Sequence, residues 1–274
     1  MFNILRDPAV APRRPRKEGA GELSDAARIM VRKSFVVITS QRTGSTLLVR
    51  SLDSSPFILC AGEIFYSGQG IHRPEFQYRY FARTKVSKLF DLLLQKRRIE
   101  RHLRWFYDEA APNVAAIGFK LMVSHARTFP AIVPYLRRTG VLGFFLYRRD
   151  TFATALSYYR ARVSGLYHTA HGLEVRSLQF VKVDEQEFER LLAVCKADQS
   201  AVLKLCDTYG GRLIAYEDMT TNWDDHIAAI GMALEMSDFR VEKMLSKIDS
   251  DGEKVQIINE PELRTRFVAD SHAR

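Results

Sequence analysis

The chain has 274 residues, 46% hydrophobic and 27% charged, which is the composition of a globular protein and excludes a fibrous or fully disordered one. Forty-one lysines and arginines against 32 acidic residues give a net charge of +9, which suits an anionic ligand, an anionic membrane surface or nucleic acid. Three cysteines without a CxxC pair argue against a disulfide framework or a zinc cluster. Because no apolar run could cross a bilayer and no signal peptide is visible, we expect a cytoplasmic protein.

Residues 1–33 are predicted to form a disordered basic tail. Pro8, Pro12 and Pro15 stand among arginines and lysines, and the segment has too few apolar side chains to offset the entropy of ordering. Residues 34–274 show no internal repeat and no clear linker, so we expect them to form a single domain.

Strands and helices are expected to alternate after the tail. Residues 35–39 are a short apolar, β-branched run that predicts a buried parallel strand, and Leu47, Leu48 and Leu52 follow at helical spacing. Further strands are expected at residues 57–60, 115–121, 141–147 and 212–216, and further helices at 85–110, 151–164, 184–209 and 223–234. This alternation predicts an α/β fold in which helices flank a P-loop-like parallel sheet.

The turn after the first expected strand, Ser-Gln-Arg-Thr-Gly-Ser-Thr over residues 40–46, is a candidate anion site. Gly44 permits a tight turn, and the helix that follows offers unpaired N–H groups and the positive end of its dipole. Ser45 and Thr46 add hydroxyl donors, and Arg42 adds a planar, permanently charged fork. The segment is not a Walker loop, because Gly44 stands where that loop has lysine. Taken alone, the pattern also fits a capped helix without a ligand.

A second strand-to-helix junction carries two adjacent arginines. The strand expected at 141–147 ends in Arg148-Arg149-Asp150, and only one of two consecutive strand side chains can face a cleft. We assign Arg149 to the ligand, together with Ser157 two turns into the next helix. Arg148 is expected to form an ion pair with Asp150 or a nearby carboxylate. Two such sites on one sheet suit a ligand with two separated phosphate-like groups.

These segments resemble the PAPS-dependent sulfotransferases, in particular the bacterial carbohydrate and glycolipid branch that includes trehalose and rhizobial lipopolysaccharide sulfotransferases. The donor PAPS (3'-phosphoadenosine 5'-phosphosulfate) carries two separated anionic groups. Residues 40–48 resemble the 5'-phosphosulfate loop of that branch, in which arginine stands where cytosolic sulfotransferases carry lysine. Arg149 with Ser157 eight residues later matches the 3'-phosphate motif. The resemblance implies a sulfotransferase-type fold, PAPS as donor and PAP as product, without a metal.

Three shorter segments agree with this resemblance. Residues 61–65 resemble the acidic segment of the family, residues 118–122 a Gly-x-Lys-Leu-Met strand, and residues 215–219 a Tyr-Glu-Asp segment whose tyrosine, here Tyr216, lies near the adenine. The chain departs from the family near its C-terminus, where Lys254 is the only candidate to replace an Arg-Lys-Gly segment. Residues 66–115 match nothing in the family, so they leave the acceptor open.

The resemblance implies catalytic roles for three side chains. Glu63 matches the acidic position that serves as general base, Arg42 would neutralise charge on the leaving group, and Lys120 would hold the sulfuryl oxygens or pair with Glu63. The N–H groups from Thr43 to Thr46 would cradle the anion. His125 is the alternative base.

The resemblance favours a hydroxyl-bearing acceptor, either a saccharide or a glycolipid. Nucleic acid is not expected, peripheral contact with an anionic membrane is left open, and the oligomeric state cannot be read from the sequence. One alternative is a P-loop-type small-molecule kinase that uses ATP-Mg, with Asp150 as the metal ligand. Another is a non-catalytic protein that binds nucleic acid or lipid through the tail and the basic helix at 85–110. It leaves both strand-end sites unexplained.

Overall fold

The computed structural model describes residues 32–68, 72–79, 88–111, 113–164, 179–236, 239–244 and 255–269, and at residues 88–93 and 269 it describes the backbone alone. The tail predicted over residues 1–33 lies outside the described residues except at its end, where Lys33 already belongs to strand β1 (Lys33–Thr39). The chain from Arg32 onward forms one compact unit. Within the described ranges, no helix combines the length and the apolar composition that a membrane span requires.

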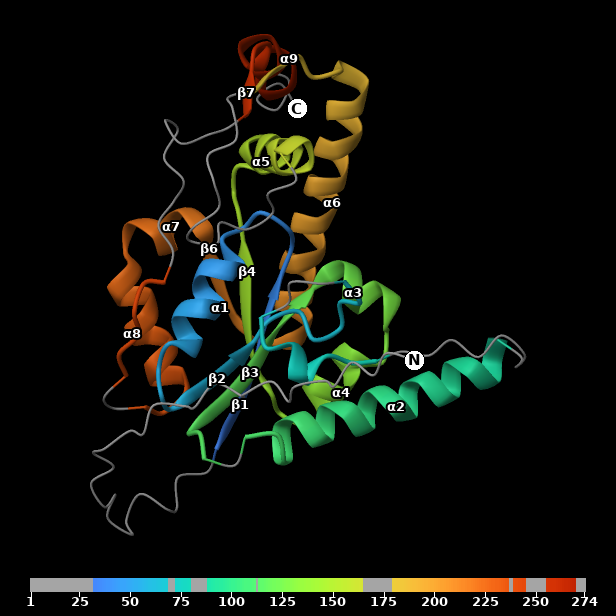
Figure 1. The fold of residues 1–274 in the computed structure, drawn as a ribbon, viewed down its shortest axis with the longest axis vertical. Helices are drawn as coiled ribbons and strands as arrows, with labels where there is room; N and C mark the ends of the chain where they lie inside the picture. Colours follow the sequence, from blue (N-terminus) through green and yellow to red (C-terminus); the bar gives the residue numbers. More distant parts are fainter. Residues whose placement is uncertain are drawn as a thin grey trace, which may run out of the picture. The chain divides into compact units, whose positions relative to one another are not determined.

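A five-stranded parallel sheet forms the centre of this unit (Figure 1). The strands stand in the order β2-β3-β1-β4-β6, with β2 at Ile58–Ala61, β3 at Ala116–Met122, β4 at Leu142–Tyr147 and β6 at Arg212–Ala215. The five predicted strands are confirmed close to their expected ends, and so is the predicted parallel α/β class. Strands β2 and β3 lie on one side of β1, and β4 and β6 lie on the other. The strand order therefore reverses at β1, and the carboxyl end of β1 is the topological switch point of the sheet.

Helices cover both faces of the sheet (Figure 1). One face carries α1 (Ser45–Asp53), α7 (Tyr216–Thr221) and α8 (Trp223–Ala233), and the other carries α2 (Lys88–Asp108), α3 (Val123–Thr128), α4 (Ile132–Arg138) and the C-terminal part of α6 (Glu185–Tyr209). Strand β1 feeds both cores in alternation, because successive strand side chains point to opposite faces. Phe35 and Val37 pack under α1 and α8, and Val36 and Ile38 pack under α2 and α4.

Helix α2 lies in the segment that matched no part of the family. Its inner face is apolar, and the side chains of Ile99, Leu103 and Phe106 are fully buried against the sheet. The Tyr107 hydroxyl donates a hydrogen bond to the Phe35 carbonyl oxygen at 2.9 Å. The predicted basic helix therefore exists, and its apolar side belongs to the core of the domain.

A third apolar cluster combines α5 (Thr151–Ser164) with the first half of α6. A two-stranded parallel sheet of β5 (Gln179–Val181) and β7 (Val255–Ile257) joins this cluster, as does α9 (Glu260–Ala269). The strand β4 leads directly into α5, so this layer is attached to the carboxyl end of the sheet. The sequence had predicted α5 and α6, but not β5, β7 or α9.

Candidate active site

The predicted anion loop joins β1 to α1 at the switch point of the sheet. Gly44 caps the N-terminus of α1 with a φ of 77°, in the left-handed region that favours glycine. A Cβ atom at Gly44 would also come within 2.6 Å of the Tyr216 ring. Among the described residues, the N–H groups of Gly44 and Ser45 donate no backbone hydrogen bond, as expected for the first turn of a helix. They are therefore available to an anion.

Hydroxyl groups inside the loop fix its shape. The Thr39 and Thr43 Oγ1 atoms lie 2.6 Å apart, and Thr39 Oγ1 also donates to the Leu146 carbonyl oxygen of β4 at 2.9 Å. The Thr43 hydroxyl lies 3.1 Å from the Ser40 carbonyl oxygen and is buried. The side chain of Thr43 therefore stabilises the loop. Thr39 was missed by the sequence analysis, because one buried threonine in an apolar strand gives no signal.

The two predicted anion sites are in direct contact. Arg42, at a φ of 59°, donates a hydrogen bond from Nε to Ser157 Oγ at 3.0 Å. Arg42 comes from the loop after β1 and Ser157 from the second turn of α5, which follows the neighbouring strand β4. The parallel pairing of β1 with β4 brings these two residues to the same edge of the sheet.

Glu63 and Lys120 meet beside the loop. The Lys120 Nζ atom lies 2.8 Å from Glu63 Oε1 and 3.5 Å from Thr46 Oγ1, and the lysine side chain is only 7% exposed. The Lys120 N–H donates to the Gly62 carbonyl oxygen at 3.2 Å, so the backbone also fixes the two segments together. An ion pair this close keeps the Glu63 carboxylate next to the start of α1. The catalytic roles assigned to both residues remain predictions.

His125 approaches the other carboxylate oxygen of Glu63. The His125 Nε2 atom lies 3.9 Å from Glu63 Oε2, and the imidazole stacks on the Tyr66 ring with centroids 6.1 Å apart. Burial lowers the pKa of His125; Glu63 acts against this and the charge of Lys120 adds to it. His125 is therefore neutral near pH 7, and it lies beside the carboxylate of Glu63, the other candidate base, at more than hydrogen-bond distance.

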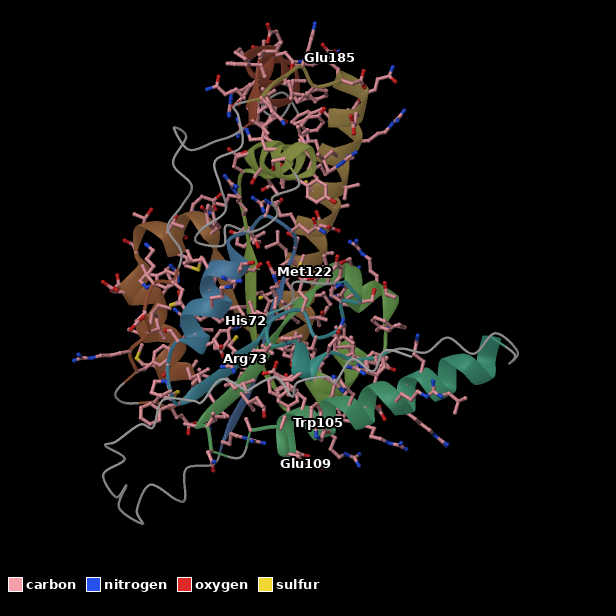
Figure 2. The ribbon with its side chains drawn as sticks, in the orientation of Figure 1. His72, Arg73, Trp105, Glu109, Met122 and Glu185 are labelled. Carbon is pink, nitrogen blue, oxygen red and sulfur yellow. The ribbon has the colours of Figure 1, made fainter. Side chains whose placement is uncertain are left out.

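The segment that carries Glu63 is anchored to α1 through Asp53. Figure 2 places His72 and Arg73 beside α1 and β2, and both donate to Asp53 Oδ2, His72 from Nε2 at 2.8 Å and Arg73 from Nε at 3.0 Å. Burial alone would raise the pKa of Asp53, but its hydrogen bonds to His72, Cys60 and Arg73 lower it. The Gly62 N–H in turn donates to the His72 carbonyl oxygen at 3.0 Å, which fixes the backbone next to Glu63.

The two arginines after β4 differ in their surroundings. Arg149, assigned to the ligand, is 53% exposed and forms a two-pronged pair with Asp218, with distances of 2.6 Å and 2.5 Å. The hydrogen bonds with Asp218 raise the pKa of Arg149, and they lower the pKa of Asp218. Arg148 is 19% exposed, its guanidinium lies 5.0 Å from the centre of the Tyr216 ring, and its Nε atom is 4.0 Å from Glu217 Oε1.

The Tyr-Glu-Asp segment, residues 216–218, contacts both candidate anion sites. Tyr216 packs on Gly44, Glu217 accepts hydrogen bonds from the N–H groups of Arg149 and Asp150, and Asp218 holds the Arg149 guanidinium. Asp150 accepts from the Ala153 N–H at 2.8 Å and so caps α5, and Arg148 approaches the other expected kind of partner, a nearby carboxylate. That carboxylate is Glu217, in the first turn of α7, which follows the neighbouring strand β6.

Gln199 of α6 donates from Nε2 to the Arg148 carbonyl oxygen at 2.6 Å and to that of Arg149 at 3.1 Å, a contact that the sequence did not indicate. Lys254, the candidate substitute for the C-terminal part of the 3'-phosphate motif, lies outside the described residues.

The chain is similar to known proteins in structure. No protein-family model and no curated protein matches the chain. Among solved structures, the chain is similar to the crystal structure of a sulfotransferase from Alicyclobacillus acidocaldarius, at 17% sequence identity and a TM-score of 0.49, over 89% of this chain and 92% of that one.

Proposed function

We propose that this protein transfers a sulfuryl group from PAPS to a hydroxyl group of a saccharide or glycolipid. The observation that carries the proposal is the ion pair of Glu63 and Lys120 beside the anion loop, where Lys120 Nζ lies between the Glu63 carboxylate and Thr46 Oγ1. A transfer reaction needs an anion cradle, a nearby positive charge and a base for the attacking hydroxyl. The chain supplies all three at the carboxyl end of parallel strands, the place where such sheets bind ligands.

The residues around the loop fit the donor in number and kind. The N–H groups from Thr43 to Thr46 and the Arg42 guanidinium would hold the 5'-phosphosulfate. Arg149 and Ser157 would hold the 3'-phosphate, and Tyr216 would lie near the adenine. The hydrogen bond from Arg42 to Ser157 supports one ligand that spans both sites, because the two sites share this contact.

The chemistry assigned to the chain is proton removal with charge compensation. Glu63, whose Oε1 atom lies 2.8 Å from Lys120 Nζ, accepts the proton of the acceptor hydroxyl. When Glu63 becomes neutral, Lys120 loses its ionic partner, and its charge is free to interact with the oxygens of the transferred group. Arg42 offsets the charge that develops on the departing oxygen. PAPS supplies the sulfuryl group when bound.

The free cysteines support the cytoplasmic location that we propose. Cys60, Cys195 and Cys206 are all buried free thiols. Burial raises the pKa of each of them, so none is a reactive thiolate.

Calorimetry with PAP and with ATP-Mg tests the proposed donor. We expect PAP to bind and ATP-Mg to bind much more weakly. The loop after β1 lacks the Walker lysine, and the proposed second anion site after β4 suits the 3'-phosphate of PAP. Transfer from labelled PAPS to a panel of sugar, glycolipid, phenol and peptide acceptors then tests the reaction. Binding of ATP-Mg in preference to PAP would overturn the proposal in favour of a kinase.

Replacing Arg149 by alanine should weaken PAP binding by about 10- to 100-fold, the effect of one lost charge-assisted pair. Adenosine 5'-phosphosulfate has no 3'-phosphate, so its affinity should change by less than about twofold. Titration calorimetry with both ligands measures the difference. Arg212→Ala is a matched control, because Arg212 is exposed at the opposite end of β6. Equal losses for the two ligands would remove Arg149 from the 3'-phosphate site.

A further inference from the structure

A cavity of about 480 Å³ lies beside the anion loop, between α3 and the paired helices α5 and α6. Ser40 and Gln41 of the loop form part of its wall, together with Ser124 of α3 and Tyr158 of α5. Its volume is in the range of small-molecule sites, roughly 300–1,000 Å³. Arg42, Ser157 and Arg149 do not line it, so it is separate from the residues assigned to the donor.

The charged side chains in this wall leave one positive charge uncompensated. Arg127 pairs with Asp198 at 2.6 Å, and Arg162 pairs with Glu187 at 3.0 Å. Arg190 of α6 also lines the cavity, and the structure gives it no ion-pair partner within the described ranges. The three arginines and two carboxylates of the wall therefore carry a net charge of +1, and the unpaired charge is that of Arg190.

The rest of the wall suits a small hydroxylated molecule. Ser124, Thr154 and Tyr158 provide hydroxyl groups, and Leu191 and Val194 of α6 provide apolar surface. A pyranose ring presents hydroxyl groups at its edge and C–H groups on its faces, so it can use both kinds of contact. The cavity thus combines hydroxyls, apolar surface and a single anchoring cation.

Helix α3 connects this cavity to the proposed base. Ser124 lines the cavity, and its neighbour His125 lies 3.9 Å from the Glu63 carboxylate. A ligand in the cavity would therefore lie next to the loop, and its reacting hydroxyl would have to extend past the start of α3 to reach Glu63, which does not line the cavity.

We infer that this cavity binds the acceptor, and that the acceptor is a saccharide with a carboxylate or phosphate group held by Arg190. The inference rests on the proposed sulfotransferase function, because that function supplies the need for an acceptor beside the loop. A guanidinium pairs with carboxylate and phosphate through two parallel hydrogen bonds, and a neutral sugar cannot make that contact.

Calorimetry on the PAP-bound protein tests the inference with three probes: methyl β-D-glucuronide, glucose 6-phosphate and methyl β-D-glucoside. At least one anionic probe should bind about tenfold or more tightly than the neutral glucoside. The stronger of the two anionic probes identifies carboxylate or phosphate as the recognised group. Arg190→Gln should remove this preference and leave the affinity of the glucoside within about twofold.

Lys196→Gln is the matched control, because Lys196 is exposed on the same helix and does not line the cavity. It should keep the preference for the anionic probe. Equal binding of all three probes, or equal effects of the two substitutions, would overturn the inference. PAP binding separates this failure from that of the proposed function: a protein that binds PAP but shows no anionic preference refutes the cavity assignment alone, and one that binds no PAP refutes the donor assignment.

Discussion

Replacing Glu63 by glutamine should reduce sulfuryl transfer by about 10²- to 10⁴-fold, the usual contribution of a general base. The amide keeps an oxygen that Lys120 Nζ can contact at the 2.8 Å position, but it cannot accept the proton of the acceptor hydroxyl. Donor binding should persist, because the loop N–H groups and Arg42 do not depend on the carboxylate. Turnover of labelled PAPS, measured together with PAP affinity, separates the two effects.

Two companion variants make this result decisive. Glu109→Gln removes an exposed carboxylate at the C-terminal end of α2, labelled in Figure 2, and should leave turnover unchanged. His125→Gln tests the alternative base, which lies 3.9 Å from the same carboxylate. If the Glu63 variant stayed active and the His125 variant did not, the base would be His125. A loss of PAP binding in the Glu63 variant would instead indicate that the ion pair with Lys120 holds the loop.

Replacing Phe106 by alanine should lower the free energy of unfolding by about 3–5 kcal/mol, the cost of truncating a fully buried aromatic side chain. The Phe106 ring is 0% exposed and packs edge-on against Phe76, Tyr107 and Phe119, with centroids 5.5 Å, 5.2 Å and 5.5 Å away. Its removal would leave a void between α2 and the sheet. Urea unfolding followed by circular dichroism measures the loss.

The neighbouring Trp105 provides the control for this prediction. Trp105 is 36% exposed, and Figure 2 shows it on α2 close to Glu109. Its replacement by alanine should cost about 1 kcal/mol, because its side chain remains partly in water before the change. Phe106→Leu, which keeps most of the volume, should cost less than about 1.5 kcal/mol and serves if the alanine variant does not fold. Similar costs for Trp105 and Phe106 would contradict the orientation of α2.

The sheet could be predicted because its strands are buried on both faces. Such strands appear in a sequence as unbroken apolar runs, and residues 35–39 and 141–147 are clear cases. The strands β5 and β7 escaped detection for the opposite reason. Each has three residues, and they pair across a long stretch of chain through Gln179 and Val255, a contact that neither segment signals by itself.

The parts of the candidate site that directly follow a strand could be predicted from the sequence. Glycine and hydroxyl residues after β1 indicated the loop, since that chemistry is local in sequence. Contacts between distant elements were not accessible in this way. Asp218 meets Arg149 only because β6 pairs with β4, and Gln199 reaches the same junction only because α6 crosses it. The Tyr-Glu-Asp segment was noticed for its likeness to other sequences, but the partners of its two carboxylates were not foreseen.

If Arg149 holds the 3'-phosphate as proposed, its contact with Asp218 makes that site selective before any ligand arrives. An anion that approaches Arg149 competes with a carboxylate that already makes two hydrogen bonds with the guanidinium. Asp218 thus acts as an internal competitor. A phosphate dianion has more charge and more acceptor oxygens than this carboxylate, whereas a hydroxyl group in the same place has neither. At the proposed donor site, the intramolecular pair would therefore favour a nucleotide with a 3'-phosphate over one with a free 3'-hydroxyl.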